Sequence, residues 1–269
     1  MAAQRPAGTG PTPANPTPDL IMDGMADGTN APAAASAGYR VLVVDDEAAL
    51  RKAVAAYLIR DGFEVTTAAD GAEALAAARE QPPDVVVLDV VMPGPDGIEV
   101  CRQLRAFSDA YIIMLTARSE EVDTLVGLAA GADDYMTKPF SPRLLVARIR
   151  TLLRRPRTAT AFGGSADDAA VRHFGALSID PTPREVRLDG ALVALTRTEY
   201  DLLEALSERP RMAFSRGQLI DRVWGSDWVG DEHLVDVHLA HIRRKLADDP
   251  SEPRYILTKR GVGYRMGPG

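Results

Sequence analysis

The chain has 269 residues, a formal net charge of −7 and an apolar content of 46%, which suits about two folded domains with cores of their own. Its single cysteine, Cys101, excludes a disulfide framework and a cysteine-rich metal site. No apolar stretch approaches the roughly 18 residues of a membrane span, and no basic segment leads into an apolar core at the amino terminus, so we expect a cytoplasmic protein with no membrane partner.

The amino-terminal stretch differs in composition from everything after it. Residues 1–38 are mostly Ala, Pro, Gly, Thr and Asp, with few large apolar side chains. Such a segment cannot bury enough apolar surface to offset the entropy of ordering it, so we predict a disordered tail.

Strand and helix patterns alternate over residues 39–155, the first predicted domain. Strands are predicted at 39–44, 64–69, 85–89, 110–116 and about 134–137. Helices are predicted at 47–60, after the capping residue Asp70, around Cys101, and at about 119–130 and 142–154. Five strands interleaved with five helices predict a five-stranded parallel sheet with helices on both faces, a doubly wound, flavodoxin-like α/β fold.

The third predicted strand organises this domain. Four apolar residues, Val85 to Leu88, precede Asp89, so the Asp89 carboxylate is expected at the carboxyl end of a strand buried on both faces. Open parallel sheets bind ligands at that edge. One aspartate in such a place more often caps a loop, so the rest of the chain has to decide between the two interpretations.

Other polar residues end the neighbouring strands. Asp45 and Asp46 follow the first strand, and three carboxylates at one sheet edge would repel one another unless a divalent cation were present. Oxygen ligands without a nearby thiol or imidazole favour Mg²⁺. Thr116 and Lys138, at the ends of the last two strands, add a hydroxyl and an ammonium. Together with Asp89 these are the groups that phosphoryl transfer to a carboxylate needs.

The first domain resembles the receiver domain of bacterial two-component response regulators. The resemblance lies in DD at 45–46, D at 89, MPGPDG at 92–97, TA at 116–117 and GADDYMTKPF at 131–140. It implies that Asp89 accepts a phosphoryl group from a sensor histidine kinase, in a reaction that the receiver itself helps to catalyse and reverse.

The same resemblance implies roles for the residues around Asp89. Mg²⁺ would be held by Asp46, Asp89 and the backbone carbonyl of Val91, with Asp45 acting through water. The phosphoryl oxygens would be contacted by Thr116 and Lys138. Tyr135 matches the aromatic switch residue that turns inward when Thr116 moves, although the residue pattern alone fits an ordinary half-buried strand tyrosine equally well.

A second domain is predicted at 174–269, after a flexible linker at 156–173 that is rich in Ala, Gly, Ser and Pro. Asp189-Gly190 indicates a hairpin. Capping boxes at Thr196 and Ser215 begin two helices.

A third helix, over about 231–247, carries an apolar stripe from Val235 to Leu246. A hairpin at 255–266 follows it. Two helices, a third helix and a basic hairpin are the plan of an α+β winged helix-turn-helix.

This second domain is similar to the OmpR/PhoB-type effector domain, through LTRTEYDLL (195–203), SRGQLIDRVWG (215–225), VDVHLAHIRRKL (235–246) and TKRGVGYRM (258–266). The similarity implies that the third helix enters the major groove of double-stranded promoter DNA and that the hairpin, the wing, reaches the minor groove. The expected DNA-binding residues are His233, Val237, His241, Arg244, Lys245, Thr258 and Arg260. A loop that contacts RNA polymerase in activators is matched by Trp224, Gly225, Ser226, Asp227 and Trp228.

Charge supports this interpretation only locally. Residues 238–265 contain seven Lys or Arg against three acids. A basic helix end also suits the helix dipole without any DNA, and the basic wing beside it favours DNA. Ala240-His241 stands where many relatives have a polar residue followed by Arg, so the base preference is expected to differ.

Phosphorylated receivers of this family form homodimers about a two-fold axis. The residues expected in that interface are Asp134, Arg148, Thr124 and Leu144. The first two match an intermolecular ion pair of the family, whereas Thr124 and Leu144 replace a second pair and Ala129 replaces a common acid. The interface is therefore expected to be more apolar here.

The sequence thus predicts a phosphorylation-controlled DNA-binding transcriptional regulator rather than an enzyme. One alternative is a phosphohydrolase of the aspartyl-phosphate type that uses Asp89, but such enzymes usually have an acid two residues later, where this chain has Val91. The other is a DNA-binding regulator that works without receiver phosphorylation, against which the intact acid cluster argues.

Overall fold

The computed structural model describes residues 38–117, 130–154, 170–226, 228 and 230–269. The predicted tail up to residue 37, most of the predicted helix 119–130 and the predicted linker up to residue 169 lie outside the described residues.

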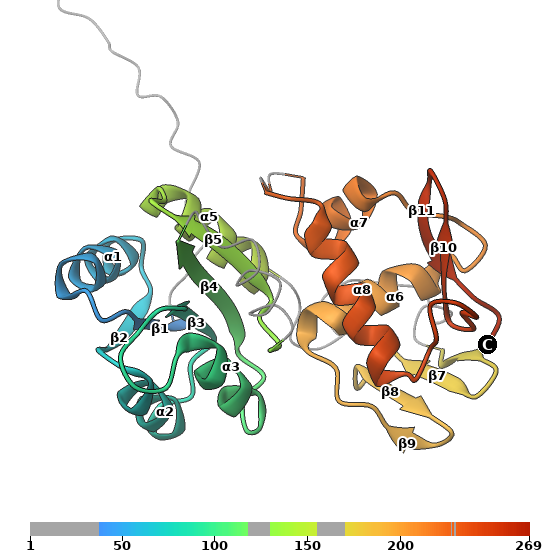
Figure 1. The fold of residues 1–269 in the computed structure, drawn as a ribbon, viewed down its shortest axis with the longest axis horizontal. Helices are drawn as coiled ribbons and strands as arrows, with labels where there is room; N and C mark the ends of the chain where they lie inside the picture. Colours follow the sequence, from blue (N-terminus) through green and yellow to red (C-terminus); the bar gives the residue numbers. More distant parts are fainter. Residues whose placement is uncertain (1–37, 118–129, 155–169, 227, 229) are drawn as a thin grey trace, which may run out of the picture. The chain divides into compact units, whose positions relative to one another are not determined.

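A parallel sheet forms the first domain, with the strand order β2-β1-β3-β4-β5 (Figure 1). Its strands are β1 (Arg40–Val44), β2 (Glu64–Ala68), β3 (Val85–Asp89), β4 (Tyr111–Ala117) and β5 (Asp134–Lys138). The described helices are α1 (Ala48–Arg60), α2 (Gly71–Glu80), α3 (Gly97–Arg105) and α5 (Pro142–Leu153). The predicted five-stranded parallel sheet is confirmed.

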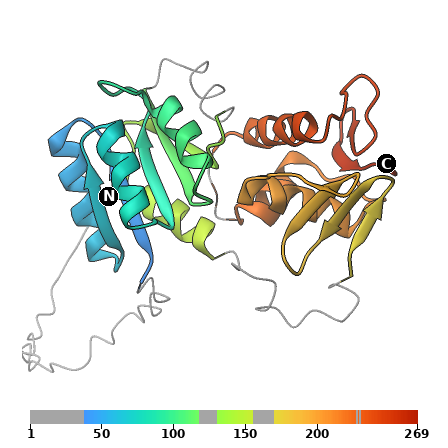
Figure 2. The same ribbon diagram turned by 90° about the horizontal axis from the view of Figure 1, so that it is seen from below.

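Helices cover the sheet on both faces, α1 packing with α5 and α2 with α3 (Figure 2). All five residues of β3 are buried, as expected for the middle strand of a sheet covered twice. Its neighbour β1 pairs from Val41 with Val85 to Val44 with Leu88. This register brings the carboxyl ends of β1 and β3 together.

A side-chain cap begins α2 at Asp70, the predicted capping residue. Asp70 accepts a hydrogen bond from the backbone N–H of Glu73 at 2.9 Å. The Glu73 carboxylate, however, accepts from the backbone N–H of Ala69 at 2.6 Å rather than from that of Asp70. The cap of α2 therefore reaches back to Ala69, one residue before the residue that a reciprocal capping box would use.

The second domain combines an antiparallel sheet, three helices and a hairpin. The sheet contains β6 (Arg172–Phe174), β7 (Leu177–Asp180), β8 (Glu185–Leu188) and β9 (Ala191–Leu192). The helices are α6 (Arg197–Glu208), α7 (Arg216–Val223) and α8 (His233–Lys245), and the hairpin strands are β10 (Ile256–Lys259) and β11 (Gly263–Met266). The predicted winged helix-turn-helix is confirmed.

Two details of this domain bear on the predictions. The capping boxes at Thr196 and Ser215 are both complete. In contrast, β6 begins inside the predicted linker 156–173, because Arg172–Phe174 pairs antiparallel with β7. A three-residue strand has no measurable period of its own, so only its partner reveals it. No helix in the described part of the chain has the length and apolar character needed to cross a membrane.

Candidate functional site

Three carboxylates meet at the carboxyl edge of the first sheet. Asp45 and Asp46 directly follow β1, and Asp89 is the last residue of β3. One oxygen from each carboxylate lies within 4.8 Å of the other two, Asp45 and Asp89 being buried and Asp46 exposed. The predicted acid cluster therefore exists, and its all-oxygen donor set suits a hard divalent cation.

Lys138, the last residue of β5, lies inside this cluster. Its Nζ atom is 2.8 Å from Asp45 Oδ2 and 2.8 Å from Asp89 Oδ2. Burial raises the pKa of Asp89 above its ordinary value, although the Lys138 ammonium opposes this. Burial also works against a charged Lys138, but its hydrogen bonds to Asp45 and Asp89 outweigh burial and raise its pKa. Lys138 is therefore held as a cation.

Backbone geometry fixes the loops around the cluster. Asp45 Oδ1 accepts from the backbone N–H of Glu47 at 2.9 Å, and the Arg51 guanidinium donates to the Asp45 carbonyl at 2.5 Å. On the other side, a Cβ at Gly97 would lie 2.0 Å from the Asp89 carbonyl oxygen. Only glycine allows this approach. The sequence-based predictions did not include Arg51 or Gly97. The second glycine of MPGPDG, Gly97, could have indicated this close approach, whereas nothing in the sequence around Arg51 indicates its contact.

The remaining predicted residues of this site lie at the same edge. Thr116 is buried near the end of β4, and its hydroxyl has no hydrogen-bond partner among the described residues. A buried hydroxyl without a partner is unusual, and an incoming oxygen-rich group would satisfy it. Val91 is 61% exposed. Tyr135 is half-buried on β5, as both interpretations of it require.

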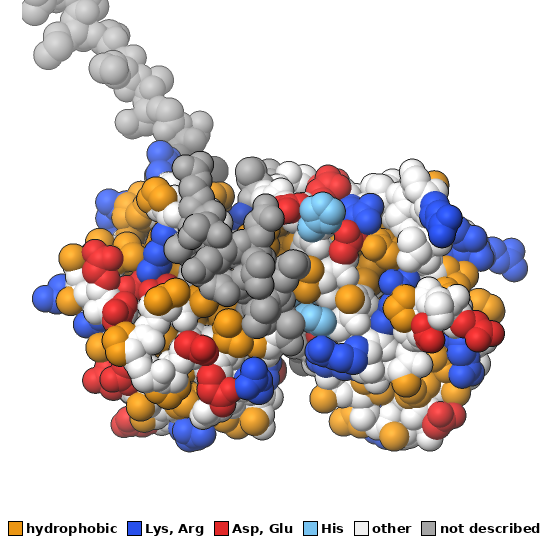
Figure 3. Space-filling model, viewed as in Figure 1, with side chains coloured by type: hydrophobic (Ala, Val, Ile, Leu, Met, Phe, Trp, Pro, Cys, Tyr) orange, Lys and Arg blue, Asp and Glu red, His pale blue; other side chains and the backbone are white. Residues whose placement is uncertain are grey.

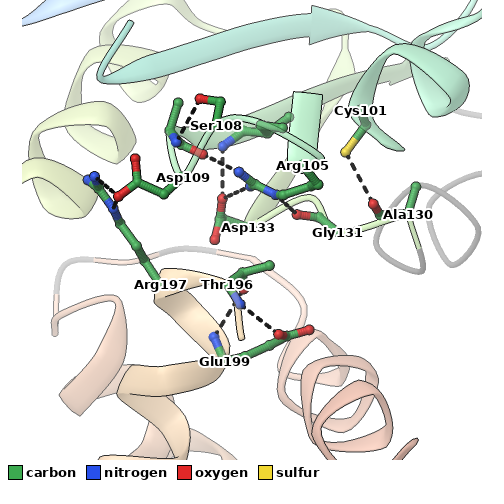
Figure 4. Close-up of polar contacts among 12 residues, drawn as sticks. Cys101, Arg105, Ser108, Asp109, Ala130, Gly131, Asp133, Thr196, Arg197 and Glu199 are labelled. Carbon is green, nitrogen blue, oxygen red and sulfur yellow. Dashed lines mark hydrogen bonds and ion pairs between the residues drawn. The ribbon is translucent and has the colours of Figure 1, made fainter. Parts of the chain in front are cut away.

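The start of β5, which carries Lys138 at its other end, is anchored by one arginine (Figure 4). Arg105 donates through Nη2 to Asp133 Oδ2 at 2.6 Å and through Nε to the Gly131 carbonyl at 2.8 Å. The Cys101 thiol lies 3.6 Å from the Ala130 carbonyl oxygen. The last helical residues of α3 therefore position the segment that leads into β5.

The residues predicted for a dimer interface are only partly described. Arg148 Nη1 lies 2.7 Å from both carboxylate oxygens of Asp134 in the same chain. The side chains are 8% and 1% exposed, so the pair is formed and buried within one subunit. Leu144 is half-buried on α5. Thr124 and Ala129 lie outside the described residues.

In the second domain, α8 presents one apolar and one polar side. Val235, Leu239, Ile242 and Leu246, the predicted stripe, are at most 1% exposed and form part of the core. Of the predicted DNA-binding residues, His233, Arg244, Thr258 and Arg260 are exposed and Val237 is half-buried.

Several of the predicted DNA-binding residues are buried or already contact other residues of the domain. The Lys245 ammonium donates to Glu199 Oε2 at 2.6 Å, and the same oxygen closes the capping box with the Thr196 backbone N–H (Figure 4). His241 is buried, and burial lowers its pKa to about 4, so its ring is neutral. The Thr258 hydroxyl accepts from Arg243 at 2.8 Å, yet Thr258 stays exposed.

The turn of the wing carries exposed basic side chains. Lys and Arg side chains gather where β10 and β11 are drawn (Figure 3), and Lys259 and Arg260 at its turn are exposed. Neither makes an ion pair with a described residue. Between β10 and β11 the chain turns through Gly261, whose φ is +74°, a conformation that favours glycine.

The loop predicted to contact RNA polymerase is described except for Asp227. Trp224 is 1% exposed and belongs to the core, so it cannot itself be a surface contact. Ser226 is exposed, and Gly225 and Trp228 are half-buried.

Comparisons with known proteins agree with both halves of this description. Residues 41–150 match the family described as response regulator receiver domain, and residues 190–266 match transcriptional regulatory protein, C terminal. The DNA-binding response regulator MtrA of Mycolicibacterium smegmatis is 44% identical over 229 residues, covering 85% of this chain and 97% of MtrA. The sensory transduction protein RegX3 of the same organism is 44% identical over 230 residues, covering 84% of this chain and 98% of RegX3. Among solved structures, a mutant of RitR matches with a TM-score of 0.67 and 29% identity over 86% of this chain and 100% of that chain.

Proposed function

The chain belongs to the DNA-binding response regulators of the OmpR/PhoB type, and from this membership we propose that phosphorylation of Asp89 by a sensor histidine kinase controls its binding to promoter DNA. The chain is thus a transcription factor rather than an enzyme, and the phosphohydrolase alternative is not retained. The observation that carries the proposal is the cluster of Asp45, Asp46, Asp89 and Lys138 at one sheet edge.

The chemistry follows from the side chains of that cluster. A carboxylate oxygen of Asp89 attacks the phosphorus of the kinase phosphohistidine, an oxygen–phosphorus bond forms, and the imidazole leaves with the electrons of the broken nitrogen–phosphorus bond. Lys138 offers a fixed positive charge to the phosphoryl oxygens. The Thr116 hydroxyl, unpartnered among the described residues, donates to one of them.

A divalent cation fits the acid cluster. Asp46, Asp89 and the Val91 carbonyl would hold Mg²⁺, and Asp45 would act through a bound water. The ion would neutralise charge on the phosphoryl oxygens and would relieve the repulsion among the carboxylates.

In the second domain, α8 is proposed as the recognition helix and the β10–β11 hairpin as the wing. His233, Val237 and Arg244 would face the major groove or its phosphates, and Arg260 would enter the minor groove. His241 is buried in this structure, so we assign it no direct contact with DNA. Lys245 would reach a phosphate only by leaving Glu199, so we give it a smaller share of the binding energy. Thr258 can still donate its hydroxyl to a phosphate while it accepts from Arg243.

Phosphorylation is proposed to join two receivers through the face that contains Leu144. The Asp134–Arg148 pair, formed within one subunit in this structure, would have to exchange partners to link two subunits. RNA polymerase would be contacted through the loop around Ser226. Binding to promoter DNA places the working protein in the cytoplasm.

The test of the phosphoryl acceptor is the intact mass of the protein before and after incubation with acetyl phosphate and Mg²⁺. Wild type should gain one phosphoryl group and Asp89→Asn should gain none. Asp134→Asn, which removes a buried carboxylate elsewhere in the same domain, is the matched control and should still be labelled. Equal labelling of wild type and Asp89→Asn would refute the assignment.

To test whether phosphorylation controls DNA binding, retention of the protein on DNA is measured with and without the phosphoryl donor. A response of wild type that Asp89→Asn lacks is expected. DNA binding that is the same in both proteins and with or without donor would favour the alternative of a regulator that works without receiver phosphorylation.

A further inference from the structure

One carboxylate in the second domain joins three elements that the DNA-binding proposal treats separately. Asp236, on α8, accepts from Arg216 Nε through both oxygens at 2.8 and 3.0 Å. Its Oδ1 also accepts from the Tyr264 hydroxyl at 2.7 Å, and its Oδ2 lies 3.1 Å from His233 Nδ1. Arg216 begins α7 and Tyr264 lies in β11, so Asp236 ties the recognition helix to its neighbouring helix and to the wing.

These contacts also change the pKa of the Asp236 carboxyl. Burial alone would raise the pKa of Asp236, but hydrogen bonds from Arg216, Tyr264 and His233 outweigh it and lower the pKa. The side chain is only 27% exposed, and the Arg216 side chain is 38% exposed. Hydrogen bonds to a charged acceptor are stronger than neutral ones, so the carboxylate is held in one place.

A second set of contacts ties the wing to α8 through its other strand. Arg243, buried on α8, donates through Nη2 to the Ile256 carbonyl and to the Thr258 hydroxyl of β10, both at 2.8 Å. Thus α8 binds β10 through Arg243 and β11 through Asp236. Backbone hydrogen bonds between Phe214 and Tyr264 also hold β11. The two side-chain links to α8, one on each strand, set how the hairpin lies against that helix.

The fixed tilt matters because of where the wing ends. Lys259, Arg260 and Val262 at the turn are exposed, Val262 by 54%, so the turn itself has little packing to hold it. The binding free energies of α8 and the wing contribute fully only when both elements already have the relative orientation that one duplex requires. Otherwise, part of the binding free energy is lost in ordering them.

We propose that Asp236 is a positioning residue for DNA binding, which holds the wing at a fixed angle to the recognition helix so that both engage one duplex together. The inference rests on the proposed roles of α8 and of Arg260. It adds that the link between Asp236 and Tyr264 makes the contributions of α8 and of the wing to DNA binding cooperative.

The variant that tests this is Tyr264→Phe, which removes only the hydroxyl bound to Asp236. Tyr200→Phe is the matched control, since the Tyr200 hydroxyl also contacts a carboxylate of this domain, Glu204 at 3.2 Å, but links neither α8 nor the wing. Asp236→Asn, which keeps the side-chain shape, is measured as a second variant. The full-length proteins, treated with acetyl phosphate, are titrated with a duplex that wild type selects from a randomised library and with a shuffled duplex.

Tyr264→Phe and Asp236→Asn should bind the selected duplex at least about twofold more weakly, the lower end of the coupling expected within a shared network. Tyr264→Phe should also flatten the salt dependence of binding although it removes no charge, because the wing then loses phosphate contacts. Arg260→Ala should weaken binding less in the Tyr264→Phe background than in wild type. Tyr200→Phe should match wild type in every measurement.

Different failures have different meanings. If Arg260→Ala weakens binding equally in the wild-type and Tyr264→Phe backgrounds, and the salt slopes agree, the positioning role of Asp236 is refuted while the DNA contacts stand. If wild type selects no duplex, or Arg260→Ala binds like wild type, the proposed DNA contacts fail and the inference fails with them.

Discussion

Asp248 offers the sharpest test of how the wing is built. Its carboxylate is 3% exposed and accepts three backbone N–H groups from the segment that leads into β10. Oδ1 accepts from Arg254 at 2.6 Å and Tyr255 at 3.1 Å, and Oδ2 accepts from Ile256 at 2.9 Å. Asp248→Ala would remove the two oxygens that accept these three hydrogen bonds.

The expected loss of stability depends on which of the three N–H groups water can reach after the substitution. Arg254 is exposed, so its N–H can be hydrated after the substitution. Tyr255 and Ile256 are buried, at 2% and 0% exposure, and their N–H groups would stay without a partner. An unsatisfied buried donor costs about 1–3 kcal/mol, so two of them predict a loss of about 2–6 kcal/mol in the free energy of unfolding of the second domain.

The assay is urea unfolding followed by tryptophan fluorescence. The chain has two tryptophans, Trp224 and Trp228, both in the second domain, so the signal reports that domain within the full-length protein. Asp248→Asn keeps one acceptor oxygen and should lose less than Asp248→Ala. The adjacent Asp249 is exposed, and its side chain contacts Ser251. The control Asp249→Ala should therefore unfold like wild type. A loss below about 1 kcal/mol for Asp248→Ala, half the lower bound, would refute this reasoning.

Four further predictions concern other parts of the chain. Arg260→Ala should weaken binding to the selected duplex by about 1–3 kcal/mol in a titration at fixed salt, and an unchanged affinity would mean that the wing does not contact DNA there. Leu144→Asp should abolish dimerisation with beryllofluoride in sedimentation but leave labelling of Asp89 intact; a mutant that dimerises like wild type would exclude this interface. Burial raises the pKa of the Cys101 thiol to about 12, so at pH 8 a disulfide reagent should modify it only after unfolding, and rapid reaction of the native protein would contradict the structure. Because the pKa of Asp236 is lowered by folding, its stabilisation should be present above the unfolded value near 3.9 and be lost as pH falls through the folded value; a difference between wild type and Asp236→Asn that is constant from pH 7 to pH 3 would refute this.

Much of the acid site was predictable because strand ends are easy to locate. A short apolar run gives both the strand and the residue that closes it, and parallel strands bring their carboxyl ends to one edge. Asp45, Asp46 and Asp89 follow directly from that rule. The pairing of Lys138 with two of these acids did not, since the reach of a long side chain across the sheet leaves no trace in residue spacing.

The second domain shows the same division. The helices and hairpin follow from capping residues, apolar stripes and turn residues. The attachments among them do not: Lys245 meets Glu199 and Arg243 meets Thr258 only after the chain has folded. A count of basic residues therefore overstates the charge available to DNA, because it cannot distinguish a cation at the surface from one used inside the domain.

The position of Lys138 gives the acid site a counter-ion of its own. With its ammonium 2.8 Å from both Asp45 and Asp89, the cluster is partly neutral before any metal arrives, so the receiver should keep its fold in a strong chelator. A divalent cation that bound to Asp45 and Asp89 would share these carboxylates with the Lys138 ammonium. The affinity of the site for a divalent cation is therefore expected to be lower than that of three carboxylates without a lysine. Release of the cation should be correspondingly easier, because the Lys138 ammonium still balances the carboxylate charge after the cation leaves.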